Sequence, residues 1–302
     1  MGLNLSGMTT ETRNPRTMQL DQMSPLEIVT VMNEEDARVP LAIAKCLPQI
    51  AQAVTWAAES FEKGGRLFYM GAGTSGRLGV LDAAECPPTF GVPKEMVVGL
   101  IAGGEKAFIE AVEGAEDSRE LAVEDLKAHG LTANDLVVGI AASGRTPYVL
   151  GGLDYAKSVG CHTAAIACNI GSAIGKAAEL ALEVNCGPEV LTGSTRLKSG
   201  TAQKLILNMI STGSMVRTGK AYQNLMVDVQ QTNEKLHTRA ENIVIDATGV
   251  EREKARAAID AAGGSVKTAI TMLLADCDAK EAARRLERAR GHVREAIRLE
   301  VL

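Results

Sequence analysis

The stretch Arg66-Leu67-Phe68-Tyr69-Met70-Gly71-Ala72-Gly73 decides the fold class, because an apolar run ends there in glycines and a helical segment follows. Four further runs of this kind follow along the chain: MVVGLIAG (96–103), DLVVGIAAS (135–143), TAAIACN (163–169) and LALEVNC (180–186). They are apolar throughout rather than alternating, as strands buried on both faces of a parallel sheet are. Helical stretches fill the gaps, so we expect a doubly wound, flavodoxin-like α/β fold with five parallel strands.

The segment before these runs, residues 1–55, predicts an N-terminal arm followed by helices. Its first 23 residues are polar and irregular, and a helix start then comes at Ser24-Pro25-Leu26-Glu27. The serine can cap the helix, the proline occupies its first turn, and Glu27 can reach back to the capping residue. A second helix is expected from Pro40 to about Glu62, because apolar positions recur there at spacings of three and four.

The sheet domain is expected over residues 56–235, and a small helical domain over residues 236–302. The last strand leads into a long helix at 197–220, and the mixed segment 221–247 is expected to pack on the core. The C-terminal part is rich in Ala, Arg, Glu and Lys. It should form a linker and three short helices, broken at Gly263-Gly264 and near Asp276–Asp278.

Composition excludes several classes of protein. The 32 Lys and Arg against 37 Asp and Glu give a net charge of −5, without the basic surface of a nucleic-acid binder. No apolar stretch is long enough for a membrane span, and the N-terminus lacks a secretion signal. The six cysteines and four histidines show no metal-ligand spacing, so we expect no metal, and the free cysteines indicate a reducing cytoplasm.

The turn after the first run, Gly71 to Arg77, is a candidate anion site. Small residues let the backbone approach a ligand, and the N–H groups of the following helix start favour an anion. Thr74 and Ser75 add hydroxyl groups. No GK[ST] follows, so this is not a Walker loop, and no acidic residue sits where a dinucleotide-binding fold needs one. The alternative is a plain strand-to-helix turn.

Two later helix starts carry similar groups. Ser143, Arg145 and Thr146 follow the third run, at the same sheet edge, which makes phosphate binding the favoured interpretation. The hydroxyl-rich stretch 193–202 follows the last run, and its Ser194 and Lys198 suit a third side of the anion site. The alternative for 193–202 is an elaborate helix cap.

Two carboxylates are candidates for acid–base chemistry. Glu85 lies in LDAAECPP (81–88), an otherwise apolar helix, and Glu116 lies in VEGAEDS (112–118) near another helix start. A partly buried carboxylate has a raised pKa and can act as an acid near neutrality. Because the chain has 37 acidic residues, spacing alone does not separate these two from ordinary solvated helix charges.

Taken together, these motifs resemble a known family. GAGTSGR (71–77) and ASGRTP (142–147) are similar to the sugar isomerase (SIS) phosphosugar-binding domain. The whole chain resembles the N-acetylmuramic acid 6-phosphate etherase family, through the motifs TETRN (10–14), DAAECPPTFG (82–91), VEGAEDS (112–118) and GSTRLKSGTA (193–202). The last motif is also shared with glucokinase regulatory proteins.

The resemblance implies a carbon–oxygen lyase that needs no metal or organic cofactor and forms a homodimer. Its two catalytic glutamates match Glu85 and Glu116, and we expect Glu85 as the acid and Glu116 as the base. A phosphosugar is the implied small-molecule partner, with no nucleic acid and no membrane. The alternatives are a non-catalytic phosphosugar sensor of the glucokinase-regulator type and a plain aldose–ketose isomerase. The apolar helix face from Leu205 to Met215 is the surface that we expect a dimer to bury.

Overall fold

The computed structural model describes residues 7–110, 112–230 and 233–299. Five parallel strands form one sheet in the order β2-β1-β3-β4-β5, which confirms the predicted fold class. The strands are β1 (Leu67–Gly71), β2 (Val97–Ile101), β3 (Leu136–Ile140), β4 (His162–Ala167) and β5 (Leu180–Glu183). Leu67 pairs with Val97 on one side and with Leu136 on the other. The direction of strand succession therefore reverses between β1 and β3, where ligands bind in open α/β sheets.

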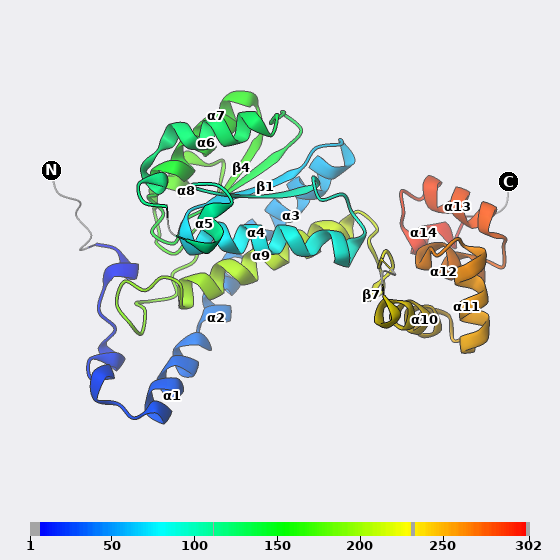
Figure 1. Cartoon of the computed structure of the whole chain (residues 1–302), viewed down its shortest axis with the longest axis horizontal. Coiled ribbons are helices and arrows are strands. Elements are labelled where there is room, and N and C mark those ends of the chain that lie inside the picture. The colour runs from blue at the N-terminus through cyan, green and yellow to red at the C-terminus, as the bar shows by residue number, and fades with distance from the viewer. Residues whose placement is uncertain (1–6, 111, 231–232, 300–302) are drawn as a thin grey trace. The chain divides into compact units, whose positions relative to one another are not determined.

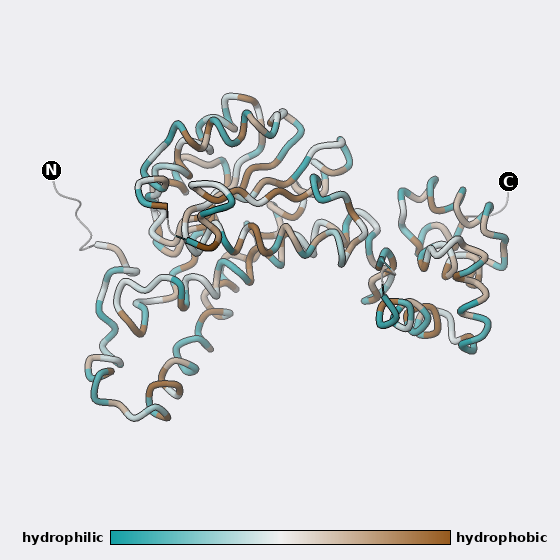
Figure 2. The backbone as a smooth tube through the Cα atoms, in the orientation of Figure 1, coloured by the Kyte–Doolittle hydropathy of each residue, from teal (hydrophilic) through white to brown (hydrophobic). Residues whose placement is uncertain are grey.

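Helices cover both faces of this sheet (Figure 1). On one face α6 and α7 bury an apolar cluster around Phe68 and Met70, and on the other α3 contacts β1, β3 and β5. A Cβ added to Gly99 of β2 would lie 2.5 Å from the Cα of Val80, so glycine is what lets α4 pack so closely. The helices are α3 (Leu47–Glu62), α4 (Gly73–Phe90), α5 (Lys106–Ile109), α6 (Arg119–Ala128), α7 (Pro147–Val159) and α8 (Ala173–Ala177). Figure 2 shows the strands among the most hydrophobic parts of the chain.

The N-terminal segment is built largely from short helices. They are three 3-10 turns (Thr9–Glu11, Pro15–Thr17, Leu20–Gln22), α1 (Pro25–Asp36), α2 (Val39–Ile43) and a further 3-10 turn (Ala44–Cys46). The predicted capping box at the start of α1 is confirmed, since Ser24 and Glu27 bond reciprocally. The single helix expected from Pro40 to Glu62 was wrong. It is broken before α3, where Pro48 cannot continue a preceding helix because it lacks an N–H and its ring crowds the carbonyl four residues back.

The long helix after the sheet is α9 (Lys198–Arg217), close to the predicted range. Its first half lies along α4, where the Ser75 hydroxyl donates to Gln203 and the Asn208 amide donates to Asp82. Apolar residues of its expected dimer face are already buried within the chain, among them Ile206 and Ile210. Part of this face therefore belongs to the chain's own core, while Met209 on the same helix is 38% exposed.

The C-terminal part contains a second hydrophobic cluster. Its elements are the ribbon strands β6 (Ala221–Tyr222) and β7 (Leu225–Met226) and the helices α10 (Glu234–Thr248), α11 (Arg252–Ala261), α12 (Val266–Ala275), α13 (Ala279–Arg288) and α14 (Val293–Ala296). Both predicted helix breaks are confirmed, but the three short helices expected after Gly249 are four, because a further turn with positive φ at Arg290 and Gly291 separates α14 from α13. We expected 221–247 to pack on the sheet core, but Ile243 and Val244 of α10 join the C-terminal cluster with Ile259 and Ile270.

The chain divides into two compact units. One comprises the chain up to Ala84 together with Glu95–Ser211, and the other comprises Glu85–Lys94 and the chain from Thr212 onward. Both α4 and α9 therefore contribute residues to each unit. In the described part of the chain, no helix combines the length and the apolar character needed to cross a bilayer.

Candidate functional site

The two anion-site loops lie next to each other at the strand switch point. The loop after β1 begins α4 at Gly73, and the loop after β3 leads into α7 at Pro147. Because β1 and β3 are neighbours in the sheet, the structure brings the predicted residues Thr74 and Ser75 to the same edge as Ser143, Arg145 and Thr146.

The β1–α4 turn is hydrogen-bonded to α9. Gly73 has a positive φ of 52°, which glycine adopts readily, and Ser75 is buried with its hydroxyl donating to Oε1 of Gln203 at 3.0 Å. Thr74 is half-buried and packs near Gly200 of α9. The Ser75 hydroxyl hydrogen is thus committed to the protein. The first N–H groups of α4, which have no partner within the helix, are the donors that the turn offers.

The β3–α7 loop is shaped by Gly144. Its φ is 72°, and a Cβ there would lie 2.4 Å from the Cβ of Ser172, so any side chain would displace the neighbouring loop. Ser143, Arg145 and Thr146 are half-buried, and the Arg145 N–H donates to the Ser143 hydroxyl at 3.3 Å. Thr146 is the residue before α7, and its side chain makes no capping hydrogen bond. The Thr146 hydroxyl therefore does not cap the N-terminus of α7.

A cavity of about 330 Å³ opens beside the β1–α4 turn. Gly73 and Arg77 line one side of it, and Val112, Gly114 and Glu116 line another. This volume lies in the range of small-molecule sites. The cavity brings one predicted catalytic carboxylate, Glu116, together with the predicted anion turn.

Arg77 fixes the segment that leads to Glu116. Its Nε donates to the carbonyl of Phe108 at 2.7 Å, and its Nη2 donates to the carbonyl of Ala107 at 2.8 Å. Hydrogen bonds from a charged donor are the stronger kind. The sequence indicated Arg77 only as extra positive charge. In the structure its hydrogen bonds connect α4 to α5.

Glu85 lies in the part of α4 that belongs to the second compact unit, and its side chain is exposed. The side chain of Glu116 is exposed as well. The expectation of two partly buried carboxylates was therefore wrong. The buried stripe of α4 runs through Gly79, Asp82 and Cys86, at helical spacing, and Glu85 lies beside it.

The buried carboxylate of α4 is Asp82, which sequence reasoning missed. Its Oδ1 accepts from Asn208 Nδ2 at 2.6 Å and from the Ser211 hydroxyl at 3.2 Å. Burial raises the pKa of the Asp82 carboxyl, although these donors favour its charged form. The helical phase of α4 is a signal in the sequence that could have identified it. Asp82 ties α4 to α9 beneath the β1–α4 turn.

The start of α9, the predicted third side of the anion site, is occupied by the chain itself. The carboxylate of Glu189, a fully buried residue, accepts from the N–H groups of Lys198 and Ser199, each at 2.9 Å, and from the Ser199 hydroxyl. This is the alternative interpretation, an elaborate helix cap. Ser194 is half-buried in the preceding loop, where its carbonyl accepts from Leu197.

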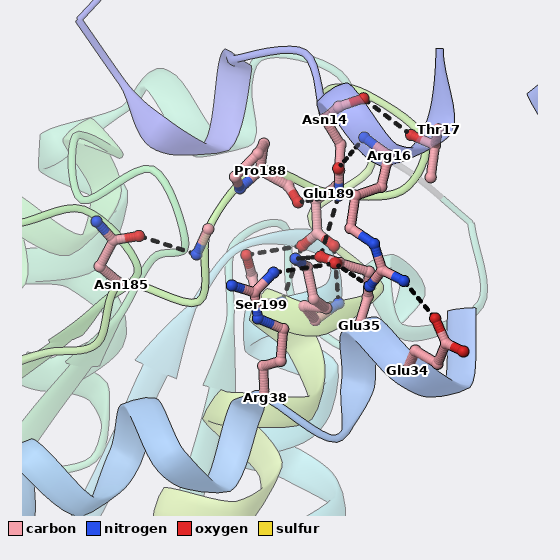
Figure 3. A network of polar contacts seen from close by, with 12 residues as sticks. Asn14, Arg16, Thr17, Glu34, Glu35, Arg38, Asn185, Pro188, Glu189 and Ser199 are labelled. Carbon is pink, nitrogen blue, oxygen red and sulfur yellow. Dashed lines mark hydrogen bonds and ion pairs between the residues drawn. The ribbon is translucent and has the colours of Figure 1, made fainter. Parts of the chain in front are cut away.

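The ammonium of Lys198 is also engaged inside the chain, by Glu35. Figure 3 shows the polar network around Glu35. Nζ of Lys198 lies 2.6 Å from Oε2 of Glu35 in α1, and both side chains are 1% exposed. Burial opposes the charge of Glu35, but hydrogen bonds from Lys198 and two further donors outweigh burial and lower the pKa of the carboxyl to about 2. The structure therefore places Lys198 in an ion pair that ties α9 to α1.

Two further donors to Glu35 come from the N-terminal strap, which we define as residues 8–17, and a third, Nη1 of Arg38, lies 3.1 Å from Oε1 of Glu35. Asn14 Nδ2 donates to Oε2 of Glu35 at 3.0 Å, and Arg16 Nη1 donates to Oε1 at 3.0 Å. Arg16 also pairs with Glu34 on the surface. At its other end the strap meets Asn169, directly beyond β4, through Thr10. Sequence reasoning missed Asn169, whose signal was its position at the end of a predicted strand.

Among the residues that the structure describes, no group of three or more His, Cys, Asp or Glu side chains is placed to hold a metal ion. The polar groups of the two loops are hydroxyls, backbone N–H groups and an arginine, and the cavity beside the β1–α4 turn adds carboxylates. Such a set can bind an anion through its donors and exchange protons through its carboxylates.

Two domain families match the sequence. The glucokinase regulatory protein N-terminal SIS domain matches residues 49–157, and the SIS domain matches residues 120–212. Together they cover the sheet and its helices.

Curated relatives match almost the entire chain. A protein of Exiguobacterium sp. named N-acetylmuramic acid 6-phosphate etherase is 63% identical over 97% of this chain and 100% of its own length. Proteins of the same name from Serratia proteamaculans and Pectobacterium atrosepticum are 61% and 60% identical, each over 98% of this chain and at least 97% of its own.

Solved structures show the same fold at low identity. A putative phosphosugar isomerase involved in capsule formation, from Bacteroides fragilis, has a TM-score of 0.52 and 22% identity, over 67% of this chain and 95% of its own. A phosphoheptose isomerase from Francisella tularensis has a TM-score of 0.50 and 18% identity, over 64% of this chain and 100% of its own. At these identities the likeness concerns the fold alone.

The buried pair yields a prediction about stability. Glu35→Gln leaves the Lys198 ammonium buried without a charged partner, so we expect a loss of about 3–5 kcal/mol in the free energy of unfolding. Glu34→Gln is the matched control, because it removes only an exposed partner of Arg16, worth about 0–1 kcal/mol. Urea denaturation followed by the fluorescence of Trp56, the one tryptophan, measures both. Equal losses in the two variants would contradict the assignment.

The same pair sets a pH dependence. The pKa of Glu35 falls from an ordinary 4.5 to about 2 in the folded chain, so its contribution is fully present above pH 4.5 and is lost as the pH falls toward 2. We expect the difference in unfolding free energy between the unaltered chain and Glu35→Gln to shrink across that window. A difference that stays constant down to pH 2.5 would show that Glu35 is not ionised in the pair.

Proposed function

The chain belongs to the N-acetylmuramic acid 6-phosphate etherase family, and from that membership we propose that it cleaves the D-lactyl ether of N-acetylmuramic acid 6-phosphate. The products are N-acetylglucosamine 6-phosphate and D-lactate. The observation that carries the proposal is the cavity between the loops that follow β1 and β2, because it joins Glu116 with the turn after β1 in one volume. We place the reaction in the recycling of cell-wall amino sugars in the bacterial cytoplasm.

The proposed chemistry is elimination followed by hydration. An ether resists direct hydrolysis, but the open-chain sugar has an aldehyde at C1 that acidifies the C2 proton. A base removes that proton, the C3–oxygen bond breaks, and an acid protonates the departing lactate oxygen. Water then adds at C3 of the unsaturated aldehyde, and C2 regains a proton. Two carboxylates with separate roles suffice for these proton transfers, so the scheme uses no metal or organic cofactor.

We assign the base at C2 to Glu116 and the acid for lactate departure to Glu85. Glu116 lines the cavity beside the β1–α4 turn, which supports its place next to a bound sugar. Glu85 is supported by its solvent-exposed position on α4 and by the family motif that contains it. Their exposure is compatible with these roles, because closure around a substrate can desolvate a carboxylate that is exposed without it.

The 6-phosphate is assigned to the two loops at the switch point. Thr74, Ser143 and Thr146 offer hydroxyls and Arg145 offers charge for such an anion. Ser75 contributes its backbone N–H in the first turn of α4, because its hydroxyl hydrogen is bonded to Gln203. Binding energy from the phosphate, far from the bond broken, can hold the sugar in register for the chemistry. Ser194 stays a candidate for the sugar or the lactate carboxylate. Lys198 is a candidate only if substrate draws its ammonium away from Glu35.

A second candidate function is a non-catalytic phosphosugar-sensing regulator. The match of residues 49–157 to the glucokinase regulatory protein domain favours it. It uses the same anion loops but requires no turnover. Release of lactate by the purified protein separates the two candidates.

Isotopic water tests the reaction. Incubation with N-acetylmuramic acid 6-phosphate in H₂¹⁸O should place ¹⁸O on C3 of the sugar product, because water adds there after lactate leaves. The isotope shift of the C3 signal in ¹³C NMR reports it, and product incubated alone in the same water is the control. Label in the lactate instead would overturn the elimination scheme, and absence of any turnover would favour the regulator.

Proton exchange separates the two glutamates. Glu85→Gln should block product release while the C2 proton still exchanges with deuterated solvent, whereas Glu116→Gln should slow both processes. Each loss is expected at roughly 10²–10⁴-fold, the scale of a positioned acid or base. Proton NMR of the C2 signal measures the exchange.

Glu113→Gln is the matched control for these variants, because Glu113 lines the same cavity and is also exposed. It should keep near-normal exchange and turnover. Exchange that persists in Glu116→Gln and disappears in Glu85→Gln would reverse the roles. Full turnover in both variants would remove both residues from the mechanism.

We also propose a homodimer, and its surface is supported by the N-terminal helices. Leu26 of α1 and Leu41 of α2 are large apolar side chains that are 74% and 71% exposed. A second copy of the chain packed on these helices would bury them. Light scattering should give about twice the chain mass of 31.8 kDa. Leu41→Asp should shift it toward the monomer, whereas Leu191→Asp, on an exposed loop, should not. A monomer in the unaltered protein would contradict the proposal.

A further inference from the structure

The motif Thr10 to Asn14 has no role in the reaction as proposed, yet the structure buries both of its ends. Thr10 is 1% exposed and Asn14 is 4% exposed, in a strap that otherwise lies largely on the surface. Buried polar side chains of this kind are retained only with hydrogen-bond partners. The partners of these two residues show what the strap holds.

Thr10 and Asn169 bind each other in both directions. The Thr10 N–H donates to Oδ1 of Asn169 at 3.4 Å, and Nδ2 of Asn169 donates to the Thr10 hydroxyl at 3.0 Å. Asn169 comes two residues after the end of β4 and is itself buried. One end of the strap is therefore fastened at the carboxyl edge of the sheet.

The same amide group holds the loop after β3. Nδ2 of Asn169 lies 3.3 Å from the carbonyl oxygen of Ala142 and 3.3 Å from that of Ser143. Because a trans peptide is planar, fixing the Ala142 carbonyl also fixes the direction of the Ser143 N–H. The strap touches this loop a second time, where Nη1 of Arg145 meets Sδ of Met8 at 3.6 Å.

The far end of the strap is anchored independently. Asn14 donates to the carbonyl of Pro188, in the loop after β5, as well as to Glu35 of the buried ion pair. The strap thus runs from the β4 edge to the α9 start, and its two ends are tied to different parts of the sheet edge. Because Asn14 is held at one end of the strap, the position of Thr10 relative to Asn169 is restricted as well.

We infer that Thr10 and Asn169 are positioning residues for phosphate binding. The strap holds Asn169, and Asn169 holds the Ser143–Thr146 loop in the conformation that accepts the phosphate of a sugar phosphate. This inference rests on the proposed function, because it takes that loop as the phosphate site. Coupling of this kind is reciprocal, so a sugar phosphate bound at the loop must also tighten the strap.

The decisive variant is Thr10→Val, which removes the hydroxyl that accepts from Asn169 and keeps the shape of the side chain. We expect the dissociation constant of N-acetylglucosamine 6-phosphate, measured by isothermal titration calorimetry, to rise about tenfold, or ~1.4 kcal/mol. Thr10→Ser restores the hydroxyl and should restore binding. Thr12→Val is the matched control, because the exposed Thr12 hydroxyl donates within the strap, to the Met8 carbonyl.

Two further measurements distinguish a positioning role of Thr10 from a role in stability alone. Thr10→Val loses a buried hydrogen bond, so its thermal midpoint should lie below that of Thr12→Val, and turnover is measured well below both midpoints. There KM should rise about tenfold with kcat nearly unchanged, as for a loss of uniform binding. Unchanged sugar-phosphate affinity in Thr10→Val would overturn the inference. So would a fall in kcat at constant KM.

Hydrogen exchange on the unaltered protein tests the coupling even if Thr10→Val does not fold. N-acetylglucosamine 6-phosphate should slow amide exchange in residues 8–17 as well as in residues 141–146. An unchanged strap beside a protected loop would overturn the inference, as would failure of the protein to bind the sugar phosphate at all. Binding and coupling without release of lactate would leave the inference standing and reject the proposed reaction.

Discussion

An ammonium buried almost completely at the start of a helix demands a carboxylate beside it, and this requirement organises the N-terminal third of the protein. Lys198 meets it with Glu35, a residue 163 positions earlier in the chain. Removing one partner of such a pair costs far more than the intact pair contributes. The pair and the donors around it therefore connect α1, α9 and the strap to one another.

The helix starts at that edge divide into two kinds. At α9 and α8 the chain's own carboxylates fill the site, since Glu189 accepts from two N–H groups of α9, and Glu183 accepts from Gly171 and Ser172 before α8. At α4 and α7, on either side of the switch point, the starts carry glycine, serine and threonine. A helix start that already holds a carboxylate repels a second anion. This difference supports the proposed phosphate site at the switch point.

Local patterns in the sequence predicted the strands, the switch-point loops, the Ser24 cap and the C-terminal helix breaks, because each depends on neighbours along the chain. The same reasoning took Lys198 for a ligand residue and left Asn169 and Glu189 unnoticed. Their partners lie on other elements, so only the folded chain shows them. Asp82 is different: it shares a helical phase with Gly79 and Cys86, and a strict application of the 3.6-residue period to 73–90 would have preferred it to Glu85 as the buried carboxylate.

The first turns of α4 place both the anion loop and a proposed catalytic base. Gly73 and Thr74 begin the helix at the end of β1, and Arg77, one turn later, holds the carbonyls of Ala107 and Phe108 in the segment that leads to Glu116. Ser75 and Asp82 tie the same helix to α9 below. A helix with these contacts moves as a rigid body, because packed protein interiors have low compressibility. In the proposed site, one rigid helix would therefore set the distance between the phosphate at its N-terminus and Glu116, with the sugar bound between them.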